Sequence, residues 1–146
     1  MEFKHVSVMF SECMQQLNIR PEGIYVDGTL GGGGHAGGIC GALNQKGIFI
    51  GIDRDKDALH AASRRLDGFS CRREFVQSNY ADIKKVLGER DIEGIDGALL
   101  DLGVSSFQLD NAQRGFSYMQ DAPLDMRMNA DDSFSAYDVV NDYGEK

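Results

Sequence analysis

Three aspartates lie at or near the ends of apolar runs, a pattern that places acids where parallel sheets bind ligands. They are Asp27, Asp53 and Asp101. If each run is a strand of one parallel sheet, the three acids gather at its carboxyl edge, where open α/β folds bind ligands. Three carboxylates stabilise a cationic ligand and repel a diphosphate. Each acid has the alternative role of capping a helix or bonding to a loop.

A glycine-rich stretch, residues 28–38, follows Asp27 and precedes an apolar segment at 39–43. Strand, glycine turn and helix let backbone N–H groups approach a nucleotide-like ligand. A flexible linker is the alternative, but linkers have polar flanks and both flanks here are apolar. The spacing Gly32-x-Gly34-x-x-Gly37 fits a dinucleotide, with Asp53 on a ribose. Asp27 instead favours S-adenosylmethionine, whose ammonium and sulfonium are cationic and which has no phosphate.

The elements that must position these residues follow from the apolar pattern. Helices are expected where apolar residues recur every three or four positions, and strands where short apolar runs occur. Asp55 is expected to cap one helix. The pattern predicts a parallel α/β sheet with right-handed crossovers and both faces covered. The predicted helices are 5–17, 39–43, 58–66 and 80–87, and the predicted strands are 24–27, 48–53, 75–77 and 97–102.

Residues 103–129 have no clear period and predict a long ordered loop of the kind that is usually functional. Ser135 and Asp138 form a potential capping box. Four strands leave the last one with an open edge, so we expect a fragment of a longer protein. The predicted domains are a ligand-binding core at 1–130 and the start of a helical insert at 131–146.

Composition narrows the function classes. The chain has 146 residues, 42% of them hydrophobic, and a net charge of −8, which argues against a broad basic surface for duplex nucleic acid. Three scattered cysteines indicate a reducing compartment, and no Cys/His cluster has the spacing of a metal site. Without a long apolar run or signal peptide, we expect a cytoplasmic protein that binds no membrane.

Several stretches of the chain together match the pattern of a known family. They are His5–Val8, Tyr25–His35, Gly51–Asp55, Asp96–Ser106, Gln108–Asp110, Arg114–Ser117 and Pro123–Met128. The last two of these stretches are the most specific, because no generic fold requires them. These stretches span nearly the whole chain and resemble the bacterial MraW/RsmH family of S-adenosylmethionine-dependent methyltransferases, which modify the exocyclic amine of a cytosine in small-subunit (16S) ribosomal RNA.

The resemblance implies a Rossmann-like class I methyltransferase fold, here incomplete, and specific site residues. The glycine turn would contact the donor, one acid would hold its ribose, and an aromatic ring would pack on its adenine. The alternative role for His35 is a hydrogen bond to the backbone, and the alternative role for Tyr80 is packing in the hydrophobic core. The implied donor-binding residues are Gly33, Gly34 and His35 in the turn, Asp53 on the ribose, Tyr80 on the adenine, and Asp101 and Gln108 completing the pocket.

The resemblance also implies a reaction and a partner, which is small-subunit ribosomal RNA or the assembled small ribosomal subunit. A cytosine amine would attack the donor methyl in line, with Asp101 accepting a hydrogen bond from the amine. The base must be unstacked, so aromatic side chains are candidates for stacking and arginines for phosphate contact. These candidates are Phe107, Phe116 and Tyr118, and Arg114 and Arg127.

Three departures from the family pattern matter. Phe107 replaces a frequent proline, Gly32 an occasional arginine, and family members are about twice as long. The Asp/Asn-Pro-Pro-aromatic motif of many amine methyltransferases is absent after residue 101. We therefore expect residues 1–146 alone not to methylate RNA. A nicotinamide- or other nucleotide-dependent enzyme and a non-catalytic domain with a vestigial pocket remain the alternatives.

Overall fold

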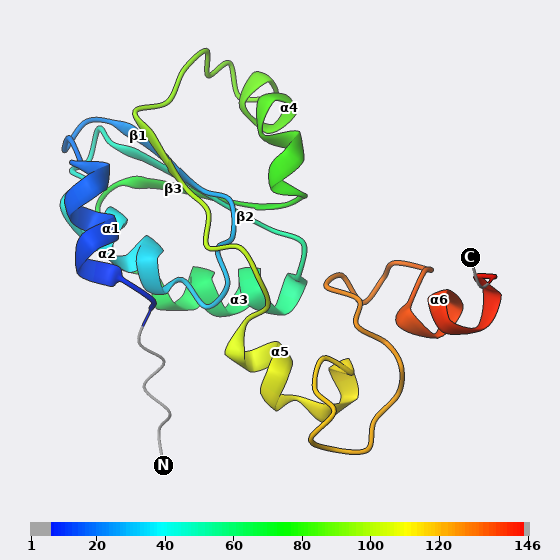
Figure 1. The fold of residues 1–146 in the computed structure, drawn as a ribbon. Helices are drawn as coiled ribbons and strands as arrows, with labels where there is room; N and C mark the ends of the chain where they lie inside the picture. The colour runs from blue at the N-terminus through cyan, green and yellow to red at the C-terminus, as the bar shows by residue number, and fades with distance from the viewer. Residues whose placement is uncertain (1–6, 145–146) are drawn as a thin grey trace. The chain divides into compact units, whose positions relative to one another are not determined.

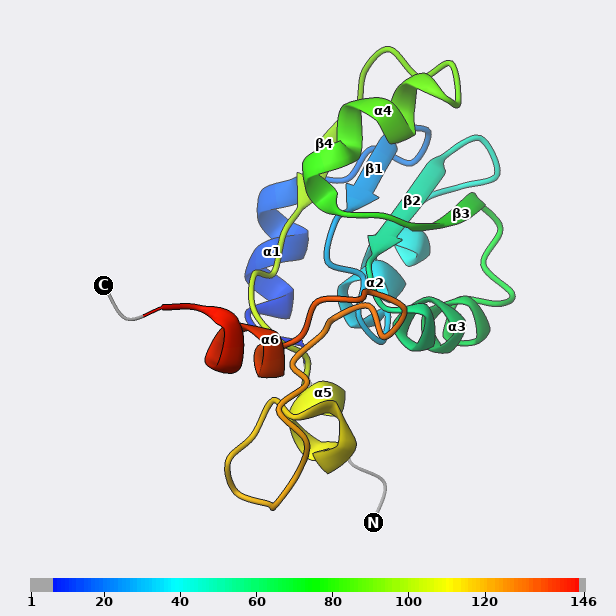
Figure 2. The same cartoon turned by 90° about the vertical axis from the view of Figure 1, so that its right-hand side faces the viewer.

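The computed structural model describes residues 7–144. Its centre is a parallel sheet in the order β3-β2-β1-β4, which confirms the predicted α/β class. Figures 1 and 2 show the strands side by side, with helices on both faces of the sheet. The strands are β1 (Ile24–Asp27), β2 (Ile48–Asp53), β3 (Arg72–Gln77) and β4 (Gly97–Leu99).

The strand order places the point where the chain reverses direction across the sheet between β1 and β4. Asp27, the last residue of β1, pairs with Gly51 on one side and with Leu99 on the other. Open α/β sheets bind ligands at such a reversal, beyond the carboxyl ends of the strands. The turn after β1 therefore occupies the expected ligand-binding position.

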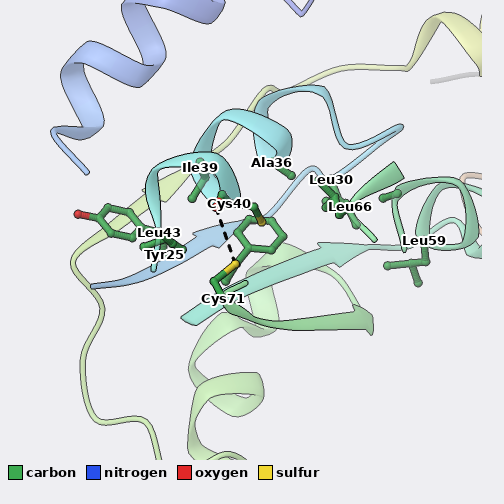
Figure 3. Packing of buried hydrophobic residues seen from close by; sticks show 11 residues of the cluster. Tyr25, Leu30, Ala36, Ile39, Cys40, Leu43, Leu59, Leu66 and Cys71 are labelled. Atoms are coloured by element: carbon green, nitrogen blue, oxygen red, sulfur yellow. Dashed lines mark hydrogen bonds between the residues drawn. The ribbon is translucent and has the colours of Figure 1, made fainter. Parts of the chain in front are cut away.

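Alternate residues of the central strands feed two hydrophobic cores. Tyr25 and Phe49 face the cluster under α1 (Phe10–Leu17), α2 (Gly34–Ala42) and α3 (Lys56–Arg65), shown in Figure 3. Val26 and Ile50 face the opposite cluster, under α4 (Ile83–Gly88). This explains why β2 is apolar at nearly every position, because a strand covered on both faces buries both sets of side chains.

Helix α2 begins at Gly34, five residues before the predicted helix, so the glycine-rich stretch is part turn and part helix. Glycine disfavours helix, but here helix-on-helix contact overrides propensity. A Cβ at Gly38 would lie 2.6 Å from Met14 Sδ and 2.6 Å from Phe10 Cζ, both on α1. Two glycines of the expected ligand loop, Gly34 and Gly38, thus allow close packing of α2 against α1 and the segment just before it.

Other bounds also differ from expectation, and three of them are as follows. Helix α1 begins at Phe10 rather than at residue 5, and residues 5 and 6 lie outside the described range. Strand β3 begins at Arg72, three residues early, because its polar first half lies at the sheet edge, where Arg72 and Arg90 pair with Glu74. Strand β4 ends at Leu99, three residues earlier than predicted.

The chain divides into two compact units, 1–102 and 103–146. The second contains α5 (Ser106–Asp110), the short helix η2 (Ala112–Arg114) and α6 (Ala136–Asp142). The first two lie within 103–129, so the predicted long ordered loop is partly helical. The predicted capping box at Ser135 and Asp138 is present. No helix among residues 7–144 has the length and hydropathy needed to cross a membrane.

Candidate functional site

The turn after β1 is fixed to the strands on both of its sides. On the β4 side, Gly28 N donates to Leu99 O at 2.9 Å. On the β2 side, Leu30 N donates to Ile52 O at 3.1 Å and Gly31 N donates to Asp53 Oδ2 at 2.8 Å. Gly31 has φ +50°, a conformation that glycine adopts without strain. The turn is therefore held in one shape by the chain itself.

Hydrogen bonding within the turn also consumes its donors. Thr29 N donates to Asp27 Oδ1 at 3.0 Å, and Gly33 N donates to Leu30 O at 2.9 Å. With the bonds of Gly28, Leu30 and Gly31, five N–H groups between residues 28 and 33 have partners within the chain. A phosphate-binding turn needs such groups pointing at its ligand. The turn thus lacks the main feature of a pyrophosphate cradle.

Asp27 is the most buried acid of the site, with 1% of its surface exposed. Desolvation raises its pKa from 3.8 to about 6, against the lowering effects of the hydrogen bonds from Thr29 and of nearby His35, while Asp53 raises it further. Burying a carboxylate is costly without compensation. Because burying this carboxylate costs free energy, we expect it to have a role in ligand binding. A negative charge at the carboxyl edge of the sheet favours a cationic ligand.

Asp53 ends β2 and links two backbone segments. Its Oδ2 accepts from Gly31 N at 2.8 Å and its Oδ1 accepts from Asp55 N at 2.9 Å. Each carboxylate oxygen has a second lone pair, so the group retains capacity for a ligand hydroxyl. Asp55 in turn caps α3 by accepting from Asp57 N at 3.0 Å, as predicted. The geometry agrees with a ribose-binding acid that also supports the turn.

Tyr80 lies beside the turn rather than in a core. It begins the short helix η1 (Tyr80–Asp82), which Asn79 caps, and 43% of its surface is exposed. A Cβ on Gly28 would lie 3.0 Å from Tyr80 Cβ and 2.5 Å from Leu100 Cδ2. Glycine at 28 therefore admits the tyrosine and leucine to the end of β1. The core-packing alternative for Tyr80 finds no support, since neither hydrophobic cluster includes it.

The residues Gly33, Gly34 and His35 have structural partners of their own. Gly33 has φ +75°, and a Cβ there would lie 3.2 Å from Ala62 Cβ on α3. His35 is buried in the first turn of α2, where Nε2 lies 2.9 Å from Val8 O and the ring stacks on Phe10. A carbonyl only accepts, so Nε2 carries the proton. The backbone-bonded alternative for His35 therefore describes its side chain.

Asp101 lies two residues beyond the end of β4 and is exposed. Its backbone N donates to Thr29 Oγ1 at 2.7 Å. That hydroxyl lies 3.4 Å from Asp27 Oδ1. Asp101 is thus connected through Thr29 to Asp27, the last residue of β1. Thr29 was not among the residues expected from sequence, and its only signal is its place two residues after a strand-end acid.

Gln108 belongs to the second unit. It is buried, and its Oε1 accepts from Ser105 N at 3.1 Å while Ser105 Oγ accepts from Gln108 N at 3.2 Å. This reciprocal pair is a capping box that begins α5. The side chain thus has a structural use in starting the helix, and its assignment to the donor pocket stays a prediction.

The two arginines expected to contact phosphate are engaged within the second unit. Arg127 makes a two-point contact with Asp125, at 2.9 and 2.7 Å, and donates to Asp132 O at 2.6 Å. Arg114 Nη2 donates to the carbonyls of Arg127 and Met128 at 3.1 and 2.8 Å. These bonds give both residues a role in holding the loop. Of the stacking candidates, Tyr118 is the most exposed, at 96%.

A separate hollow of about 570 Å³ lies between α1, α2 and α3. Its lining includes none of Asp27, Asp53, Tyr80 or Asp101. The charged and aromatic residues of the carboxyl edge therefore mark the candidate site better than the hollow does. The hollow is lined by Ser7, Phe10, Ser11, Gly34, Gly37, Gly38, Arg65, Leu66 and Phe69.

Two curated relatives cover the chain from end to end. Ribosomal RNA small subunit methyltransferase H of Clostridioides difficile is 57% identical over 145 residues, which are 99% of this chain and 47% of the relative. The protein of the same name from Clostridium botulinum is 54% identical over 146 residues, 100% of this chain and 47% of the relative. The chain thus spans about half the length of these relatives.

A solved structure supports the fold. A protein from Clostridium thermocellum, assigned as an rRNA methylase, superposes with a TM-score of 0.50 at 14% identity, over 56% of this chain and 48% of that one. The family model described as the MraW methylase family matches residues 2–146. This match covers nearly every residue and agrees with the resemblance seen in the motifs. The chain belongs to the MraW methylase family.

Proposed function

We propose that this chain forms the S-adenosylmethionine site of a methyltransferase that modifies the exocyclic amine of a cytosine in small-subunit ribosomal RNA. The observation that carries the choice of donor is the turn after β1. Its N–H groups at Thr29 and Gly31 are bound to Asp27 and Asp53, so acids surround the ligand position where a dinucleotide would need free donors. The names of the two relatives support the RNA substrate.

The residues present fit this donor. Asp53 keeps lone pairs for ribose hydroxyls, and the half-exposed ring of Tyr80 is available to pack on adenine. Gly33, Gly34 and His35 give the backbone that the donor contacts, and Asp101 and Gln108 complete the pocket. The predicted domain limits, a donor-binding core at 1–130 and a helical insert from 131, belong to this proposal.

When bound, S-adenosylmethionine supplies a methyl group activated by a positively charged sulfur. The protein must bring an unstacked cytosine amine into line with that methyl. It must also stabilise the positive charge that develops on the amine. Asp101 is exposed beyond β4 and is the residue we assign to hydrogen-bond the amine. The methyl–sulfur bond would break as the carbon–nitrogen bond forms, and the neutral thioether would leave with that electron pair. The amine proton would pass to water after the methyl arrives, so no strong base is required.

Calorimetry tests the donor. S-adenosylmethionine and S-adenosylhomocysteine are expected to bind and NAD is not, and binding of NAD alone would reject the proposal. Asp53→Ala is expected to weaken binding by about 10-fold or more, because hydrogen bonds to a carboxylate and the bond to Gly31 are lost. Glu93→Ala, at an exposed acid after α4, serves as the matched control with unchanged affinity. No binding of either sulfur ligand would favour a vestigial pocket.

A further inference from the structure

The Thr29 side chain connects the turn after β1 with the segment that follows β4. Strand β4 pairs with β1 only as far as Leu99 and Asp27, and beyond Leu99 the chain leaves the sheet. The backbone bond from Gly28 N to Leu99 O closes the ladder. Two residues later, Asp101 N donates to Thr29 Oγ1 at 2.7 Å, a contact between residues 72 positions apart.

The direction of this bond orients the hydroxyl. An N–H can only donate, so Thr29 Oγ1 accepts from Asp101 and has its own proton left to give. Asp27 Oδ1, 3.4 Å away, is a carboxylate oxygen that also accepts from Thr29 N at 3.0 Å. Threonine is β-branched and therefore has few side-chain rotamers. One side chain thus binds the backbone of one acid and the carboxylate of the other.

We propose that Thr29 is a positioning residue, whose hydroxyl couples Asp101 to Asp27 and so sets where both acids stand in the donor site. This inference rests on the proposed function, because it is the donor that the two acids serve. Without the hydroxyl, Asp101 loses its hydrogen bond to the turn after β1, and Asp27 loses one of its donors. The turn keeps its backbone bonds to Leu99 and Ile52, so the fold survives the loss.

The electrostatics of Asp27 give the coupling a measurable sign. Apart from its burial, the groups that act on its charge are His35 of α2 and Asp53 of β2, together with the two donors of Thr29. Donation from the hydroxyl stabilises the ionised form of Asp27. Removing the hydroxyl is therefore expected to raise the pKa of Asp27 further, so that the acid becomes neutral at a higher pH than in the unmodified protein.

Two variants separate the hydroxyl from the shape of the side chain. Thr29→Val keeps the branched shape and removes the hydroxyl, whereas Thr29→Ser keeps the hydroxyl. We expect Thr29→Val to weaken S-adenosylmethionine binding about 10-fold at pH 7 and to shift the pH midpoint of binding upward. Thr29→Ser is expected to retain both values. Unchanged affinity and midpoint in a folded Thr29→Val protein would overturn the proposal, and Thr29→Ala replaces it if the valine variant does not fold.

Two measurements without ligand distinguish failure of this inference from failure of the proposed function. Carbon-13 NMR titration of the Asp27 carboxyl is expected to move to higher pH in Thr29→Val and to stay in place in Thr29→Ser. Hydrogen exchange of the Asp101 amide is expected to accelerate only in Thr29→Val. If the donor does not bind at all but both shifts occur, the coupling stands and the assigned ligand is wrong. If neither shift occurs, the coupling is wrong whatever ligand binds.

Discussion

Each of the two compact units of the chain is stabilised internally by a different kind of interaction. Every buried hydrophobic residue of the described chain precedes Leu102, and all but Leu99 belong to clusters on the two faces of the sheet. In the described part of the second unit, residues 103–144, Gln108 is the single buried residue. Hydrogen bonds of Arg114 and Arg127 to carbonyls and to Asp125 fix that unit instead.

This difference teaches how each unit responds to perturbation. Apolar burial is insensitive to pH and sensitive to lost volume. Charge-assisted hydrogen bonds at an exposed surface depend on geometry, pH and salt. The second unit also exposes many large apolar side chains, among them Tyr118, Met119 and Tyr143. We therefore expect core mutations to act on the first unit, and changes in charge to act on the second.

The largest effect is expected from Phe49→Ala. Phe49 is fully buried in the cluster beneath α2, and truncation of such a ring leaves a cavity. We expect the free energy of unfolding to fall by about 3–5 kcal/mol in urea titrations. Phe134→Ala, at a half-exposed ring in the second unit, is the matched control, with a change within about 0.5 kcal/mol. Equal losses at the two positions would remove the contrast between the units.

A second test uses Asp27→Asn, which keeps the shape and removes the charge. Desolvation raises the pKa of Asp27 from 3.8 to about 6, so ionisation costs the folded state. Below pH 3.8 neither state is ionised and there is no penalty; stability then falls as pH rises to 6, and the penalty is full above it. We expect the variant to be more stable at pH 7 by up to about 3 kcal/mol and to bind the donor less tightly.

The second unit is expected to respond to pH with the opposite sign. The hydrogen bond from Arg127 lowers the pKa of Asp125 below 3.8, so its contribution is present above that pH and is lost as pH falls through the lowered value. Hydrogen exchange resolved by segment, at pH 3 to 7, measures both units in one sample. Loss of protection at 103–144 on rising pH from 4 to 6 would contradict this assignment.

A more local effect is expected from Arg127→Met. The variant loses the two-point contact with Asp125 and the bond to Asp132 O. We expect proteolysis within 103–144 to accelerate several-fold while the first unit stays resistant. Arg127→Lys keeps the charge without the planar fork and should give an intermediate rate. Equal protection in all three proteins would show that the arginine does not hold the loop.

The smallest effect is expected from the helix caps. Ser135→Ala removes the capping box of α6, for about 0.5–1 kcal/mol, confined to that helix in hydrogen exchange. Asp55→Ala at the start of α3 removes a buried cap beside the sheet. We expect its loss to appear in global unfolding because α3 covers the main core. A global effect from Ser135→Ala would mean that the two units unfold together.

Sequence reasoning predicted best where burial is two-sided. Strands β1 and β2 have the predicted bounds. Both are central strands with side chains buried on both faces of the sheet, so nearly all of their residues are apolar. Strand β3 was only half recognised because an edge strand tolerates the ion pairs of Arg72 and Glu74. The predicted range of β4 is too long because Leu100 is apolar, yet it lies beyond the end of the strand. Its side chain lies beside Gly28.

The site was predictable by type more than by contact. The pattern placed Asp27, Asp53 and Asp101 at one edge, but which acid is buried depends on tertiary neighbours. The sequence predicts a turn at 34–38, where the structure has helix α2. Helix propensity takes no account of the neighbouring helix α1, which makes glycine necessary at Gly38. Local patterns likewise give no sign of a link across 72 positions, such as the one that Thr29 makes.

That link has a consequence for the order in which the molecule is made. A ribosome emits residues 24–31 long before residue 101, and contacts between distant positions form late in folding. The bonds of the turn to β2 need only residues up to 53, whereas those of Gly28 and Thr29 await Leu99 and Asp101. A nascent chain stalled near residue 90 should therefore hold a half-built turn, and the donor site should mature only when β4 emerges.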